Sequence, residues 1–132
     1  MIDIFNELYT LVVNTLTTYD NTISYSSVYT NMPTNYPFVS MEEISDSVYE
    51  RGSDSDEIEN FANKEYEINI YTKNPNKKSK CDSIAQVVDT LLKSKGFVRV
   101  SKNILQDENE TIYRLIIRYS GVVSKDHNIY RR

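Results

Sequence analysis

Two groups of carboxylates come closest to acid–base or metal chemistry in this chain. Glu42 and Glu43 are adjacent, and the pattern around them predicts a strand, whose successive side chains point to opposite faces. We therefore expect no shared proton and no general acid–base pair. The run 54–57 offers oxygen ligands but lacks the glycine and the bidentate glutamate at the spacing of a calcium loop. We interpret this run as part of a solvated acidic loop over 51–57.

The other residue types that perform chemistry are scarce. The chain has one cysteine, Cys81, and one histidine, His127, which leaves disulfides, multi-cysteine metal sites and most catalytic triads without partners. Cys81 falls on the apolar stripe of a predicted helix, which is typical of a small buried side chain. The three glycines are too scattered to build a phosphate loop. We therefore predict no catalytic residue, no metal site and no cofactor, and we do not expect an enzyme.

The densest basic cluster lies ahead of the second predicted helix, at Lys73, Lys77, Lys78 and Lys80. Such a cluster would attract DNA passing near the protein. The formal net charge is nevertheless −4, whereas a general nucleic-acid binder carries a clustered excess of basic residues. We favour a solvated helix start and keep a small nucleic-acid-binding module as an alternative.

Charge is divided along the chain. Residues 42–67 hold ten acidic residues against two basic ones, and residues 68–132 hold thirteen basic against six acidic. Opposite poles of this kind give copies of one chain, or stacked partners, complementary potentials.

Tyrosine is abundant, with 11 residues and no tryptophan. Tyrosine supplies large contact area with a polar end and is enriched at protein interfaces. Four tyrosines are predicted to face the core: Tyr9, Tyr66, Tyr113 and Tyr119. Four others are not: Tyr36, Tyr49, Tyr71 and Tyr130.

Seven elements must position these residues. Apolar residues at helical spacing predict a helix over 2–18 and a second helix that ends at Gly96. The second helix carries an apolar stripe of Cys81, Ile84, Val88, Leu91 and Leu92. Alternating patterns predict strands over 23–29, 38–48, 65–72, 97–104 and 111–123. We predict an α+β fold of order α-β-β-β-α-β-β, with two helices packed on one face of a mostly antiparallel sheet. The length of 132 residues fits a single domain over 1–123, followed by a basic tail over 124–132.

The last strand carries apolar residues on both faces. Tyr113, Leu115, Ile117 and Tyr119 fall on one side, and Ile112, Arg114, Ile116 and Arg118 fall on the other. We expect the second side to be covered by another subunit.

No segment predicts a membrane span or a signal peptide. The longest apolar run, 115–117, is far below the roughly 18 residues that a bilayer needs. Asp3 and Glu7 stand where a signal peptide carries positive charge. We expect no membrane partner and no secretion by that route.

Several segments, taken in order, resemble one family of phage proteins. The segments are Pro37-Phe38-Val39 with Glu42-Glu43-Ile44-Ser45, Tyr66-Glu67-Ile68-Asn69-Ile70-Tyr71, Gly96-Phe97-Val98-Arg99, Ile112-Tyr113-Arg114, Arg118-Tyr119 and Ile129-Tyr130-Arg131-Arg132. The chain is similar over nearly its whole length to the tail-terminator, or tail-completion, proteins of long-tailed phages and prophages of Gram-positive bacteria.

The resemblance implies a structural virion protein at the head-proximal end of the tail, present in the host cytoplasm during assembly. It implies a hexameric ring that caps the tail tube, stops its polymerisation and offers the surface for head–tail joining. The implied partners are other copies of the chain, the major tail tube protein and the head-completion connector, with DNA only passing through the ring channel. We assign the interface to Ile112, Ile116, Arg114, Arg118, Tyr130, Arg131 and Arg132. A neck or head-closure connector of the same virion remains an alternative.

Overall fold

The structure is a computed structural model of the whole chain, and it describes residues 3–27, 33, 35–48, 61–74, 76–106, 112–124 and 129–130. Its elements are α1 (Phe5–Tyr19), β1 (Ser24–Ser26), β2 (Phe38–Val48), β3 (Phe61–Lys73), α2 (Lys77–Ser94), β4 (Val98–Gln106), β5 (Ile112–Ser124) and β6 (Ile129–Tyr130). The predicted order of helices and strands is confirmed, and β6 is an addition to it.

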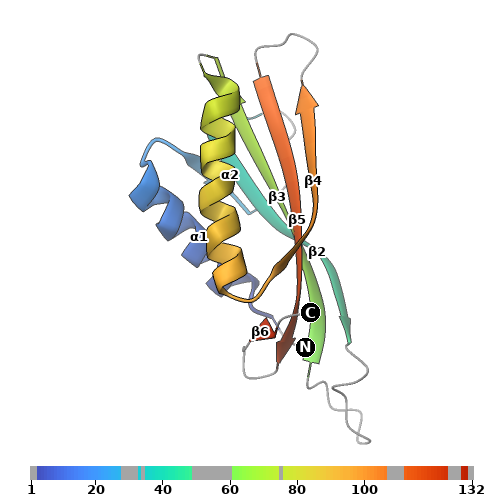
Figure 1. Cartoon of the computed structure of the whole chain (residues 1–132). Coiled ribbons are helices and arrows are strands. Elements are labelled where there is room, and N and C mark those ends of the chain that lie inside the picture. Colours follow the sequence, from blue (N-terminus) through green and yellow to red (C-terminus); the bar gives the residue numbers. More distant parts are fainter. Residues whose placement is uncertain are drawn as a thin grey trace, which may run out of the picture.

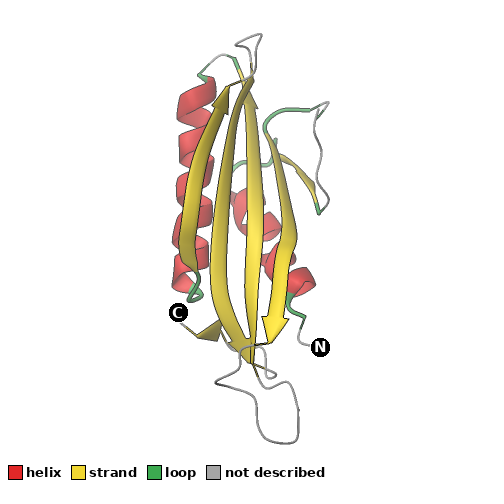
Figure 2. Cartoon of the chain, turned by 90° about the vertical axis from the view of Figure 1, so that its right-hand side faces the viewer, coloured by secondary structure: helices red, strands yellow, loops and turns green. Residues whose placement is uncertain are grey.

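The strands form one sheet in the order β1-β2-β3-β5-β4, with β6 beside β5. β1 runs parallel to β2, and the other described pairs are antiparallel. Both helices lie against the same face of the sheet (Figure 1). After a turn that brings the side of the sheet away from the helices toward the viewer, the long strands stand in front and the helices lie behind them (Figure 2). This is the predicted α+β class.

The core fills the space between the helices and the sheet. α1 contributes Leu8, Val12 and Leu16, spaced four residues apart, because residues at this interval share one side of a helix. Buried residues of α2 follow the same rule: Cys81, Ile84, Ala85, Val88 and Leu92. The sheet contributes Val39, Met41, Tyr66, Ile68, Ile70, Tyr113, Leu115, Ile117 and Tyr119. The predicted inward faces of the third and fifth predicted strands are therefore confirmed.

α2 ends at the glycine that the sequence predicts. Gly96 has a φ of 102°, a left-handed conformation that glycine adopts without a steric penalty. Its N–H donates to the Lys93 carbonyl at 3.1 Å, and the Phe97 N–H donates to the Leu92 carbonyl at 3.0 Å. These are the two bonds of a Schellman motif, which satisfies carbonyls at the helix end and turns the chain into β4.

Several strands have bounds in the structure that differ from the predicted ones. β3 begins four residues before the predicted Glu65, because Phe61 pairs with Ser124 on β5. β1 is shorter than the predicted strand over 23–29. Ile129 and Tyr130 pair with Val123 and Val122, so part of the region interpreted as a basic tail belongs to the sheet. The acidic loop 51–57 lies outside the described residues.

Candidate functional site: the open face of the sheet

We call the side of the sheet that faces away from the helices the open face. It comprises Phe38, Ser40 and Glu42 on β2, Glu67, Asn69 and Tyr71 on β3, and Ile112, Arg114, Ile116 and Arg118 on β5. No described helix or strand covers it (Figure 2). Four residues of the predicted interface lie here together, as the alternation along β5 requires.

An ion pair crosses the open face where β3 meets β5. Glu67 and Arg118 are direct cross-strand partners. The Arg118 Nε and Nη2 atoms lie 3.2 and 3.1 Å from the Glu67 Oε1 atom. Glu67 is 9% exposed, and its Oε2 atom accepts a hydrogen bond from the Asn69 amide at 3.3 Å.

A second set of contacts continues this ion pair along the face. Arg114 donates from Nε and Nη2 to the Asn69 Oδ1 atom at 3.2 and 2.8 Å. Its guanidinium lies 5.2 Å from the centre of the Tyr71 ring, a cation–π contact. The Tyr71 ring meets Phe38 edge-on, with centroids 6.0 Å apart. We call this chain of contacts, Phe38–Tyr71–Arg114–Asn69–Glu67–Arg118, the open-face ladder.

The ladder buries polar groups without a second layer of structure. Asn69 is fully buried and Tyr71 is 2% exposed, because the arginine side chains and neighbouring strands cover them. Tyr71 was expected outside the core, and it does lie on the open face, but its own protomer already buries it. Each buried carboxylate or amide of the ladder has a hydrogen-bond or ion-pair partner within the protomer, so the face is ordered before any partner arrives.

The apolar members of the predicted interface keep part of their surface. Ile112 and Ile116 are half-buried, and Ile116 pairs with Asn69 on β3 and Asn103 on β4. They are not sealed inside the protomer, so they remain available to a partner.

Glu42 and Glu67 form a carboxylate pair that the sequence analysis missed. They are cross-strand partners on β2 and β3. Burial, then the Glu67 charge and a hydrogen bond with Glu67, raise the pKa of Glu42 above its usual range. Glu43, by contrast, contacts Lys64 on the helix side at 3.3 Å. The expectation that Glu42 and Glu43 point to opposite faces is therefore confirmed, while the pairing of Glu42 depends on strand register.

Tyr130 is the one remaining predicted interface residue whose backbone the structure describes. Tyr130 is the cross-strand partner of Val122 in β6, and its side chain is outside the described residues, as are Arg131, Arg132 and His127. Among the predicted interface residues whose side chains are described, the structure brings Ile112, Arg114, Ile116 and Arg118 together on the open face.

Cys81 is fully buried in the core, as its place on the helix predicts. Burial, followed by the charge of Asp82, raises the pKa of the Cys81 thiol to about 12. The described residues contain no group of three or more histidine, cysteine or acidic side chains that would hold a metal ion. Neither described helix is long and apolar enough to cross a membrane.

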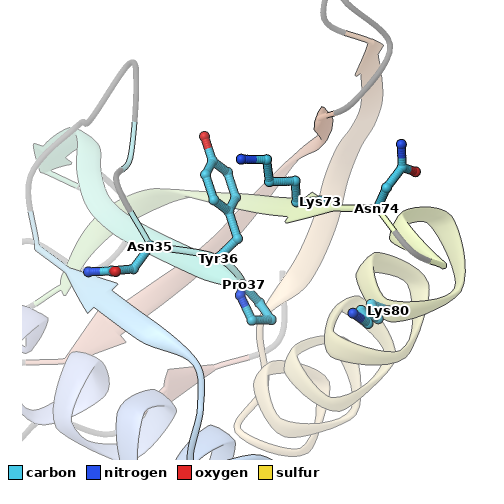
Figure 3. Close-up of a pocket in the computed structure, with 6 residues that line it drawn as sticks. All are labelled: Asn35, Tyr36, Pro37, Lys73, Asn74 and Lys80. Atoms are coloured by element: carbon cyan, nitrogen blue, oxygen red, sulfur yellow. The ribbon is translucent and has the colours of Figure 1, made fainter.

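Two lysines of the predicted basic cluster, Lys73 and Lys80, border a separate depression at the start of α2. Asn35, Tyr36, Pro37, Lys73, Asn74 and Lys80 line a volume of about 270 Å³. Lys73 and Tyr36 lie side by side, and Asn74 and Lys80 stand near the start of α2 (Figure 3). The Lys73 Nζ atom is 5.4 Å from the centre of the Tyr36 ring. This depression is polar and positively charged.

No protein-family model matches the chain, and no curated protein matches it.

Proposed function

We propose that this protein is a structural virion-assembly protein, the tail terminator of a long-tailed phage. Copies of it form a ring on the finished tail tube, stop the addition of tube subunits and offer the surface to which the head connector binds. DNA passes through the ring without sequence-specific contact.

One observation carries the proposal: the segments that resemble tail-terminator proteins supply every member of the open-face ladder. Phe38 comes from the first segment, Glu67, Asn69 and Tyr71 from the second, and Arg114 and Arg118 from those in β5. The resembling segments therefore include one continuous surface, together with core residues such as Ile68 and Tyr119. The two-layer fold that the resemblance implies also agrees with the structure.

The chemistry of the open face suits docking to a protein. Arginine and tyrosine are enriched at interfaces, and the ladder satisfies its charges before contact, so docking would leave no buried charge unpaired. Ile112 and Ile116 add apolar area between the polar groups. A face of this mixed character fits a ring that exists in water and later meets the tube. We therefore assign the open face to the terminal tube subunits rather than to sister copies.

The test is capping of tail tubes assembled from the purified tube protein of the same phage. Added protein should arrest tube growth and appear in negative-stain images as a ring at one end. Ile116→Arg should abolish capping, and Thr90→Arg, an exposed change on α2, should leave it intact. A chain that neither forms rings nor binds tubes contradicts the proposal. Rings that bind the head connector but not the tube would favour the neck protein.

A further inference from the structure

The exposed apolar side chains of the described residues gather at the two margins of the sheet. Six large hydrophobic side chains are exposed, and five of them lie on β4 or β2. They are Val98, Val100, Ile104 and Leu105 on β4 and Ile44 on β2. Exposed apolar residues on an edge strand favour pairing with another chain.

Both margins carry free backbone edges within the described residues. β4 pairs with β5 alone. β1 covers β2 only at 38–40, which leaves the edge of 41–48 free. The free stretches, 98–106 and 41–48, are similar in length. Unpaired N–H and C=O groups along such stretches are a template for another strand.

The strand directions match. β2, β3, β5 and β4 alternate in direction across the sheet, so β4 runs antiparallel to β2 (Figure 2). A second copy placed beside the first, without being turned over, would therefore present β4 to β2 as an antiparallel pair.

The charges and irregularities of the two edges are also complementary. On β4, Arg99 and Lys102 lie on the helix side and flank a register shift. On β2, Glu43 lies on the helix side, where it contacts Lys64, and the backbone of Asp46 is the cross-strand partner of Lys64; the two positions flank another register shift. Antiparallel pairing that sets Arg99 opposite Asp46 also sets Lys102 opposite Glu43.

The same register places the two irregularities beside each other. Val100 lies within the shift on β4 and is 55% exposed, and Ile44 lies within the shift on β2 and is 39% exposed. Ile104 would then face Met41, the first residue of β2 beyond the part that β1 covers. The pairing therefore uses the free part of β2 and stops where β1 begins.

We infer that β4 of one copy pairs with the free edge of β2 of the next copy, so that successive sheets join head to tail. The inference rests on the proposed function. The partner is a second copy of the chain, and the contact joins two different edges of the sheet, β4 and the free part of β2. A contact between two different surfaces closes into a ring when the rotation between copies closes, and otherwise extends as a filament.

Cysteine cross-linking tests the contact directly. The native Cys81 is buried, and its raised pKa of about 12 keeps it unreactive. A chain with both Val100→Cys and Ile44→Cys should form a series of disulfide-linked multimers under mild oxidation, with or without tail tubes. The matched control, Val100→Cys with Thr90→Cys, should stay monomeric on a non-reducing gel.

Single variants distinguish head-to-tail from symmetric pairing. Val100→Cys alone and Ile44→Cys alone should give no cross-link, while a mixture of the two should give dimers only. Dimers from Val100→Cys alone would indicate that β4 pairs with itself and would overturn the inference. Absence of cross-links in the doubly substituted chain would overturn it as well.

A charge exchange supplies an independent readout. Arg99→Asp or Asp46→Arg alone should weaken association by about tenfold or more, because like charges then face each other. The two changes together should restore it, which a variant that merely fails to fold would not do. Lys78→Asp, at an exposed position on α2, is the control for altered net charge.

The outcomes separate this inference from the proposed function. If both single charge variants still cap tubes and the doubly substituted cysteine chain forms no cross-links, the proposed terminator function stands and the edge contact is rejected. Cross-linked multimers that never cap a tube would retain the edge contact and reject the terminator.

Discussion

The two faces of one sheet bury their residues in different ways. On the helix side, two helices cover apolar residues such as Leu115 and Ile117, which are nearly inaccessible. On the open face no described element covers the strands, and Asn69 and Glu67 are shielded by the side chains of Arg114 and Arg118. The helix side is stabilised mainly by loss of apolar surface from water. The open face depends on directional contacts, which keep it ordered and suit it to recognition.

Neighbouring residues on β5 make the comparison sharpest. Leu115→Ala removes a fully buried side chain and should cost about 2–5 kcal/mol in free energy of unfolding. Ile116→Ala, one residue away on the half-buried open face, should cost about 1 kcal/mol, since less area is lost from burial. Urea denaturation of both variants measures the difference. Equal losses would mean that the open face is as well buried as the core.

Gly121 tests how tightly the helix side is packed. A Cβ atom there would lie 2.7 Å from Cδ1 of Phe97, and the Phe97 ring is held edge-on against Tyr66 at 5.7 Å. Gly121→Ala should therefore cost about 1–3 kcal/mol through overpacking. Pairing it with Phe97→Leu, which removes part of the ring, should recover some of the loss in the same denaturation assay. Unchanged stability of Gly121→Ala would contradict the close approach.

The Arg118–Glu67 ion pair on the open face should contribute less to the free energy of unfolding than the packing on the helix side. Arg118 is 47% exposed on its side chain, so solvent screens its charge, and Arg118→Met should cost about 1 kcal/mol. Glu67→Gln made alone and together with Arg118→Met completes a double-mutant cycle. A coupling energy of zero would show that the pair has no role in ordering the face.

The smallest expected effects are in the pH dependence of the free energy of unfolding. Glu42 on the open face and Asp89 on the helix side are expected to change it in opposite directions. The raised pKa of Glu42 means that its contribution to stability is present below its ordinary value of 4.5 and is lost as pH rises through the raised pKa. Glu42→Gln should remove this loss. The stability of the variant relative to the unsubstituted chain should therefore increase between pH 4 and neutrality. Thermal denaturation across this range measures it.

Asp89 on α2 is the counterpart on the helix side. Burial raises its pKa, but hydrogen bonds from Lys93 and Tyr119 and the charges of Lys93 and Arg99 outweigh burial, and the pKa is lowered. Its contribution is present above its ordinary value of 3.8 and is lost as pH falls through the lowered pKa. Asp89→Asn should therefore flatten the acid side of the profile. A steeper acid loss in that variant would contradict the assigned direction.

Local pattern was sufficient to predict most of the elements. β2 has the predicted bounds, 38–48, and α2 ends at Gly96 as predicted. The inward residues of β3 and β5 follow from alternation alone. These features depend on periods of 3.6 and 2 residues and on the conformational freedom of one glycine, all of which act over a few neighbouring residues.

The sequence by itself thus determined the class of fold, the inward faces and the presence of Ile112, Arg114, Ile116 and Arg118 on one side of a strand. Only the tertiary structure decided that Glu42 meets Glu67, that Tyr71 is buried under Arg114, and that exposed apolar residues gather at the sheet margins. Arg114 and Asn69 are 45 residues apart in the chain. Their contact depends on which strands pair and in what register, and no local period of either strand contains that information.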